Sequence, residues 1–125
     1  MKKSAFLLTI LFTVSFGVLT SGKQVMLYQI MKNDVGELNK LAGSLGISGT
    51  GWPVSDSENT LPLNVRGVSF IIFETAIRYE GNDTITIVKH KTQELIFNNG
   101  GLSGSIPDIT FEELIMLSMS YNNIS

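Results

Sequence analysis

Side chains that could do chemistry are few in this 125-residue chain. His90 is the only histidine and cysteine is absent, so a His/Cys cluster that binds a transition metal is excluded. Since His90 lies between Lys89 and Lys91 at the end of a β-prone run, we expect it to be solvated rather than catalytic. The adjacent carboxylates Glu112 and Glu113 are expected to keep the surface soluble.

The glycine pair in Asn99-Gly100-Gly101 is not a phosphate-binding loop, because neither a lysine nor the start of a helix follows it. No nucleophile has a recognisable base beside it in the pattern. We therefore expect no catalytic site, no metal site and no cofactor, and we expect that the chain is not an enzyme.

The elements that would position a binding site begin after residues 1–22, which are predicted to form a signal peptide. Lys2 and Lys3 supply a basic start, residues 5–19 are apolar, and residues 20–22 are small, as a signal peptidase requires. The alternative is a retained anchor, although the apolar run is shorter than the roughly 20 residues that span a bilayer. The sequence predicts a secreted or cell-surface protein that meets a membrane only if the signal is uncleaved or an anchor lies downstream.

The net charge limits the expected partners, and the absence of cysteine limits how the chain can be stabilised. The net charge of −2 becomes −4 without the two leading lysines, which leaves seven basic and eleven acidic residues. Nucleic acid is therefore not an expected partner. An exported domain without cysteine has no disulfides, so packing alone must stabilise it.

Apolar residues at spacings of three and four predict an amphipathic helix over about 24–43. Asp34 followed by Glu37 has the spacing of a capping box, so two shorter helices are the alternative. Gly43 or Gly46 is expected to end the helical segment.

Residues 46–62 are rich in Gly, Ser, Thr, Asp and Pro and predict an irregular connector. Within it, Trp52 is expected to pack against the helix; a ligand-stacking role is the alternative. Residues 65–73 are β-prone, and the runs 76–79 and 84–88 flank the turn-forming cluster 80–83, which predicts a β-hairpin.

Two sites match the glycosylation sequon, Asn82 at the expected hairpin tip and Asn123 near the end of the sequence. They carry a modification only if the source has a eukaryotic secretory pathway.

The pattern changes at about residue 92. Residues 95–102 align with residues 117–124, apolar on apolar, at a shift of 22. The second segment, Leu114-x-x-Leu117-x-Met119-x-x-Asn122-x-Ile124, fits the L-x-x-L-x-L-x-x-N-x-L signature of leucine-rich repeats. A short strand there would turn Leu117 and Met119 inward and Ser118 outward. The amide of Asn122 is expected to bond backbone groups at the following bend.

Residues 102–107, Leu-Ser-Gly-Ser-Ile-Pro, resemble the L-x-G-x-I-P element of plant-type leucine-rich-repeat proteins, which bacterial surface proteins share. The resemblance implies a curved solenoid whose concave face binds a protein or peptide. Trp52 and residues 65–68 lie where that family has a tryptophan and a W-x-G-V-like element after a helical cap. The family's usual cysteine pair is absent, and Val65 replaces the aromatic residue.

The predicted fold class is α/β: an N-terminal helical cap and β-hairpin (23–91) followed by the start of a leucine-rich-repeat solenoid (92–125), about one and a half repeats of a truncated array. The predicted function is an extracellular recognition module that binds a protein or peptide ligand; the alternative is a self-contained exported α+β structural protein without repeats. The predicted repeat positions are Leu95, Phe97, Leu102, Ile106, Pro107, Leu114, Leu117, Met119, Asn122 and Ile124. The predicted concave-face binding residues are Glu94, Ile96, Asn98, Met116, Ser118 and Ser120.

Overall fold

One helix and six strands make up the part of the chain that the computed structural model describes, residues 22–125. The predicted signal peptide lies outside these residues, apart from Gly22. The elements are β1 (Gln24–Ile30), α2 (Lys32–Leu45), β2 (Val68–Glu80), β3 (Asp83–Ile96), β4 (Ser103–Gly104), β5 (Met116–Ser118) and β6 (Asn123–Ile124).

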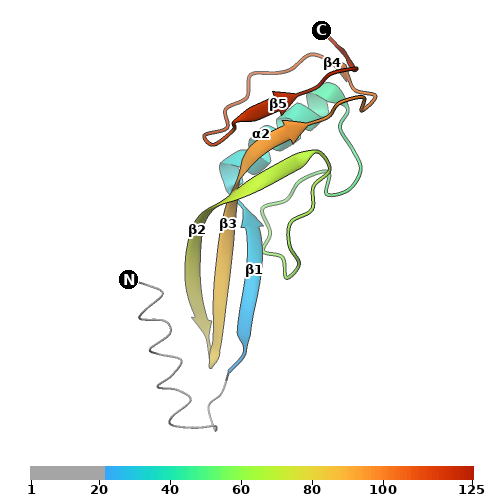
Figure 1. Cartoon of the computed structure of the whole chain (residues 1–125). Helices are drawn as coiled ribbons and strands as arrows, with labels where there is room; N and C mark the ends of the chain where they lie inside the picture. Colours follow the sequence, from blue (N-terminus) through green and yellow to red (C-terminus); the bar gives the residue numbers. More distant parts are fainter. Residues whose placement is uncertain (1–21) are drawn as a thin grey trace.

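β3 is the centre of a mixed, four-stranded sheet (Figure 1). β2 pairs with it in antiparallel fashion along almost its whole length. β1 and β5 both pair with it in parallel on the opposite edge, β1 along residues 84–90 and β5 along residues 94–96. β4 and β6 form a separate two-stranded parallel sheet.

The predicted fold class is therefore wrong. The chain is mostly β with a single helix among the described residues, and it is not a helical cap followed by a leucine-rich-repeat solenoid. β3 also runs through the predicted boundary between residues 91 and 92, so the two predicted parts share a strand.

The error begins at residues 24–30, which were expected to be helical and form β1. Their apolar residues fit a helical spacing, but Val25 and Leu27 also alternate as a strand requires. A seven-residue parallel ladder with β3 decides the outcome, because tertiary pairing overrides weak local preference. The helix starts only at Lys32.

The end of α2 follows the expectation for Gly46, while Gly43 lies inside the helix. Gly46 has a left-handed backbone, with φ of 70°, and its N–H donates to the carbonyl of Ala42. The helix buries Leu38, Leu41 and Leu45 on one face.

Asp34 does not cap the helix. Met31 is the N-cap residue, and no side chain bonds the first turn. The Asp34 side chain is fully buried instead, and its Oδ2 accepts a short hydrogen bond from the backbone N–H of Thr92 in β3. The capping-box prediction is therefore wrong.

The reason for this bond lies in the ladder between β1 and β3. Met31 donates its N–H to the carbonyl of His90 at 2.9 Å, and in a continued parallel ladder the Met31 carbonyl would accept from Thr92. That carbonyl instead accepts the first helical bond, from Val35 at 3.1 Å. Because the chain passes from β1 into α2 here, the Met31 carbonyl is not free for Thr92, and the Asp34 carboxylate accepts from the Thr92 N–H in its place.

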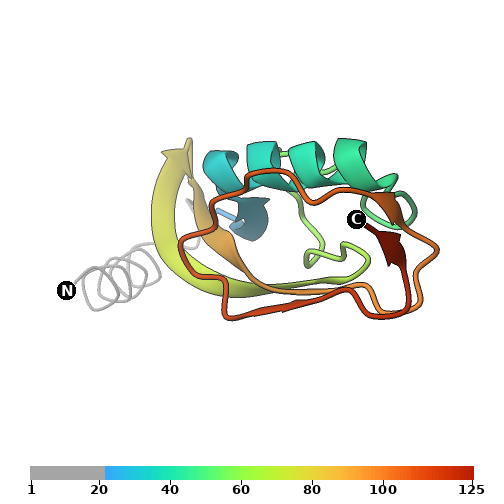
Figure 2. The same ribbon diagram turned by 90° about the horizontal axis from the view of Figure 1, so that it is seen from above.

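The core lies between α2 and the upper part of the sheet. Figure 2 shows α2 along one side, β3 and its continuation along the other, and the connector after the helix between them. Ile47, Val54 and Val65 of that connector pack with the helix leucines and with Leu95 and Phe97. The helix, the connector and the sheet together enclose this core.

Trp52 packs at the rim of this core. Its ring centroid lies 6.1 Å from that of Phe97, and its indole N–H donates to the carbonyl of Arg66 at 2.9 Å. A half-buried indole with a satisfied N–H explains the residue through packing.

The predicted β-hairpin is confirmed: β2 and β3 are joined by a turn that leaves Asn82 exposed at its tip. With β1, the lower halves of β2 and β3 extend beyond the helix as a three-stranded arm (Figure 1). Arg78 of β2 bonds both carboxylate oxygens of Glu58 at 3.0 Å. These hydrogen bonds raise the pKa of Arg78 above its ordinary value, although desolvation opposes the rise.

We predict that Asp34→Ala lowers the free energy of unfolding by about 1–3 kcal/mol, because the buried N–H of Thr92 loses its acceptor. Asp34→Asn is the matched variant: it keeps an oxygen at the same place and should retain most of the stability. Urea unfolding followed by circular dichroism measures both. Equal stability of Asp34→Ala and the parent chain would contradict the role assigned to this bond.

Candidate functional site

The six residues predicted for the binding face come together on the exposed side of β3 and β5. The register places Glu94 beside Met116 and Ile96 beside Ser118. Asn98 and Ser120 follow these strands and continue the same two rows, since Asn99 donates its N–H to the carbonyl of Ser120. We call these six residues the outer face: Glu94, Ile96, Asn98, Met116, Ser118 and Ser120.

The outer face combines apolar and polar groups in fixed positions. Ile96 is 40% and Met116 is 46% exposed. The Oδ1 atom of Asn98 accepts from the hydroxyl of Ser118 at 2.7 Å and from the backbone N–H of Ser120 at 2.8 Å. These bonds hold the two polar residues across neighbouring strands, so the face is organised before any partner arrives.

The predicted repeat positions divide into buried and exposed sets. Leu95, Phe97 and Leu102 belong to the buried core. Leu114, Met119 and Ile124 are partly buried against it, and Pro107 is half-buried. Ile106 and Leu117 are 41% and 43% exposed, so the expectation that Leu117 enters the core is wrong.

Asn122 links two neighbouring stretches of backbone, residues 97–102 and residues 119–122. Its Oδ1 accepts from the N–H groups of Gly100 at 2.9 Å and Leu102 at 3.0 Å. Its Nδ2 donates to the carbonyl of Phe97 in the first stretch and to the carbonyl of Met119, at 3.0 Å, in the second. The amide therefore satisfies backbone groups at the bend, the contact that the sequence pattern predicts for an asparagine there.

The predicted glycosylation residues are both accessible. Asn82 lies at the hairpin tip, and Asn123 lies in β6. Their side chains are on exposed residues, one at each end of the molecule (Figure 1).

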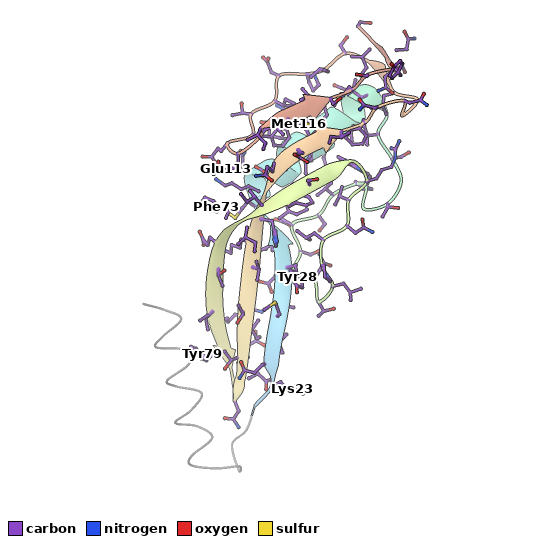
Figure 3. The ribbon with its side chains drawn as sticks, viewed as in Figure 1. Lys23, Tyr28, Phe73, Tyr79, Glu113 and Met116 are labelled. Carbon is purple, nitrogen blue, oxygen red and sulfur yellow. The ribbon has the colours of Figure 1, made fainter. Side chains whose placement is uncertain are left out.

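A second cluster escaped the sequence analysis. Lys91 of β3 has a side chain only 7% exposed, and its Nζ lies 2.6 Å from Oε1 of Glu112. The same Nζ lies 3.7 Å from the ring centroid of Phe73. Figure 3 labels Phe73 on β2, Met116 on β5 and Glu113 in the loop before β5. This cluster fastens the loop before β5 to β3, and no local pattern signals it, because its members are far apart in sequence.

His90 also differs from expectation. It lies within β3 rather than at a strand end, and it is half-buried rather than solvated. Its ring lies 6.3 Å from that of Tyr28 and 6.4 Å from that of Phe70, and Nδ1 is 3.0 Å from the carbonyl of Val88. His90 therefore packs with Tyr28 and Phe70 in a cluster of rings on the sheet.

A cavity of about 350 Å³ lies inside the connector, between Ile30 and residues 51–65. The lining residues with polar side chains are Ser55, Ser57, Asn59, Thr60 and Asn64. None of the residues that line the cavity has a charged side chain.

Residues 22–125 contain no cluster of three or more His, Asp or Glu side chains that could hold a metal ion. Within the same span, α2 is neither long nor apolar enough to cross a bilayer.

No protein-family model, curated protein or solved structure matches this chain. Fold and site together define a small domain in which one helix packs on a mixed sheet and the opposite side of the sheet is exposed. The outer face presents exposed apolar groups beside hydrogen-bonding groups.

We predict that Asn122→Ala lowers the free energy of unfolding by about 2–3 kcal/mol, because several backbone groups lose their partner at once. Asn123→Ala is the matched control, since the neighbouring side chain is exposed and makes none of these bonds. Thermal unfolding measures both variants. A loss of the same size in the two would show that the amide of Asn122 has no special role.

Proposed function

We propose that this protein is a secreted or cell-surface recognition module that binds a protein or peptide ligand through the outer face. The observation that carries the proposal is the grouping of the outer-face residues: four lie on two parallel strands in register, Asn98 and Ser120 follow those strands, and Ile96 and Met116 are exposed. Exposed apolar anchors among hydrogen-bonding groups are typical of protein-binding surfaces.

The strands support this proposal by making the outer face rigid. A surface carried by a sheet loses little conformational entropy when a partner binds, in contrast to a surface carried by loops. Ser118 and Ser120 are held by Asn98, and β3 with its continuation is anchored in the core through Leu95 and Phe97.

The resemblance of residues 92–125 to leucine-rich repeats supports the same function. β3 and β5 pair at the offset of 22 residues at which the sequence aligns with itself, Leu95 beside Leu117. We propose that this segment is related to the repeats of that family and shares their use of the exposed strand surface for recognition.

Selection of binders from a random peptide library against the purified chain tests the function. We expect most selected peptides to lose at least about tenfold in affinity for Met116→Asp, because the charge is placed among desolvated contacts. Met26→Asp is the matched control: Met26 is similarly exposed, at 50%, but lies on β1 in the arm. Binding measured by isothermal titration distinguishes the two variants.

Two outcomes of that selection would contradict the proposal. Peptides that lose affinity only for Met26→Asp would place recognition on the arm. Selected peptides that bind the parent chain and both variants equally would show that neither surface recognises them.

The alternative is a self-contained exported structural protein of α+β type. A helix packed on a four-stranded sheet around one core is the observation that favours it. Its sheet would resemble a repeat only by coincidence, and the outer face would have no ligand.

Thermal unfolding of the purified chain separates the two hypotheses. A recognition module with exposed Ile115, Leu117 and Tyr121 at its end is expected to unfold broadly and at modest temperature. A sharp, monomeric, cooperative transition at high temperature would instead favour the structural protein.

A further inference from the structure

The free edge of β5 is a second surface at the same end of the molecule. β5 pairs with β3 along one edge, and no strand among residues 22–125 pairs with its other edge. The carbonyls of Ser118 and Ser120 accept from Phe97 at 2.8 Å and from Asn99 at 2.7 Å. In a parallel ladder alternate residues face the partner, so the N–H and C=O of Leu117 point away from β3.

Apolar side chains accompany these outward backbone groups. Leu117 is 43% exposed, and Ile115 and Tyr121, which flank the strand, are 71% and 86% exposed. An exposed apolar strand edge with outward-pointing backbone groups is a template on which a further strand can form.

Charge decides which strand that is. Residues 92–125 contain four carboxylates, Glu94, Asp108, Glu112 and Glu113, and no lysine, arginine or histidine. Lys91 neutralises Glu112, whereas Glu113, which is exposed and lies three residues before the start of β5, takes part in none of the ion pairs within residues 22–125. A second copy of the chain would bring identical carboxylates together, which disfavours self-pairing.

We propose that the free edge of β5 binds an extended segment of the partner protein, rich in lysine or arginine and β-branched residues, as an added strand. This inference rests on the proposed recognition function and names the class of ligand. The partner's backbone bonds Leu117, its apolar side chains cover Ile115 and Tyr121, and its cations lie near Glu113.

The test uses two synthetic seven-residue peptides, one of alternating valine and lysine and one of alternating valine and glutamate, added to the isotopically labelled chain. We expect the lysine peptide to bind, to protect the Leu117 amide from hydrogen exchange, and to bind more weakly as salt rises. The glutamate peptide should not bind.

Leu117→Pro removes the outward N–H while leaving the bonds of Ser118 and Ser120 to β3, so it should weaken binding of the lysine peptide about tenfold. Leu117→Ala keeps the N–H and is the matched control. Should Leu117→Pro fail to fold, Glu113→Lys provides the second variant: it should lower affinity several-fold, and Asp56→Lys, an equal charge change in the connector, should not.

The inference is overturned if the lysine peptide does not bind, if the glutamate peptide binds equally well, or if the chain alone forms a discrete dimer through β5. A lysine peptide that shifts the signals of Ile96 and Met116 but leaves the Leu117 amide unprotected overturns the edge proposal while leaving the outer-face function intact. If the library peptides described above also ignore Met116→Asp, both proposals fail.

Discussion

The hydrogen bond from Thr92 to the buried carboxylate of Asp34 is the contact on which the rest of the structure depends. One edge of β3 changes partners here, from β1 to β5, and the backbone N–H at the change would otherwise be buried without an acceptor. Because Asp34 belongs to the first turn of α2, the same bond fixes where the helix leaves the sheet. One side chain thus joins the first turn of the helix to the point at which β3 changes partners.

The sheet is stabilised differently on the two sides of Thr92. Below it, the arm is a three-stranded ribbon held by backbone pairing and by the ion pair of Arg78 with Glu58. Above it, the sheet is closed by α2 on one side and exposed on the other, as Figures 1 and 2 show together. The Lys91–Glu112 pair, next to Thr92, attaches the loop that leads into β5. The position of the outer face on β3 and β5 therefore depends on contacts that lie behind it.

Local sequence patterns correctly predicted the elements that are determined by interactions between neighbouring residues. The hairpin follows from β-prone runs around a turn, and Gly46 ends α2 because glycine adopts the left-handed conformation without strain. Residues 24–30 could not be assigned this way, since their strand exists only through pairing with residues 84–90 of β3. Asp34 was misread for the same reason: its spacing from Glu37 is local, whereas its partner is 58 residues away. The grouping of the outer face was accessible because a self-alignment at 22 residues carries long-range information.

The division between outer face and free edge follows from the geometry of a short parallel strand. Side chains of β5 alternate between the two sides of the sheet, so Met116 and Ser118 share the outer face while Leu117 lies between them. Backbone groups alternate in the sheet plane by the same period, and those of Leu117 point away from β3. A ligand that lies along β5 can therefore contact side chains of the face and backbone of the edge at once. In the proposed complex, side chains on the face would set specificity, and the backbone edge would add affinity that depends little on sequence.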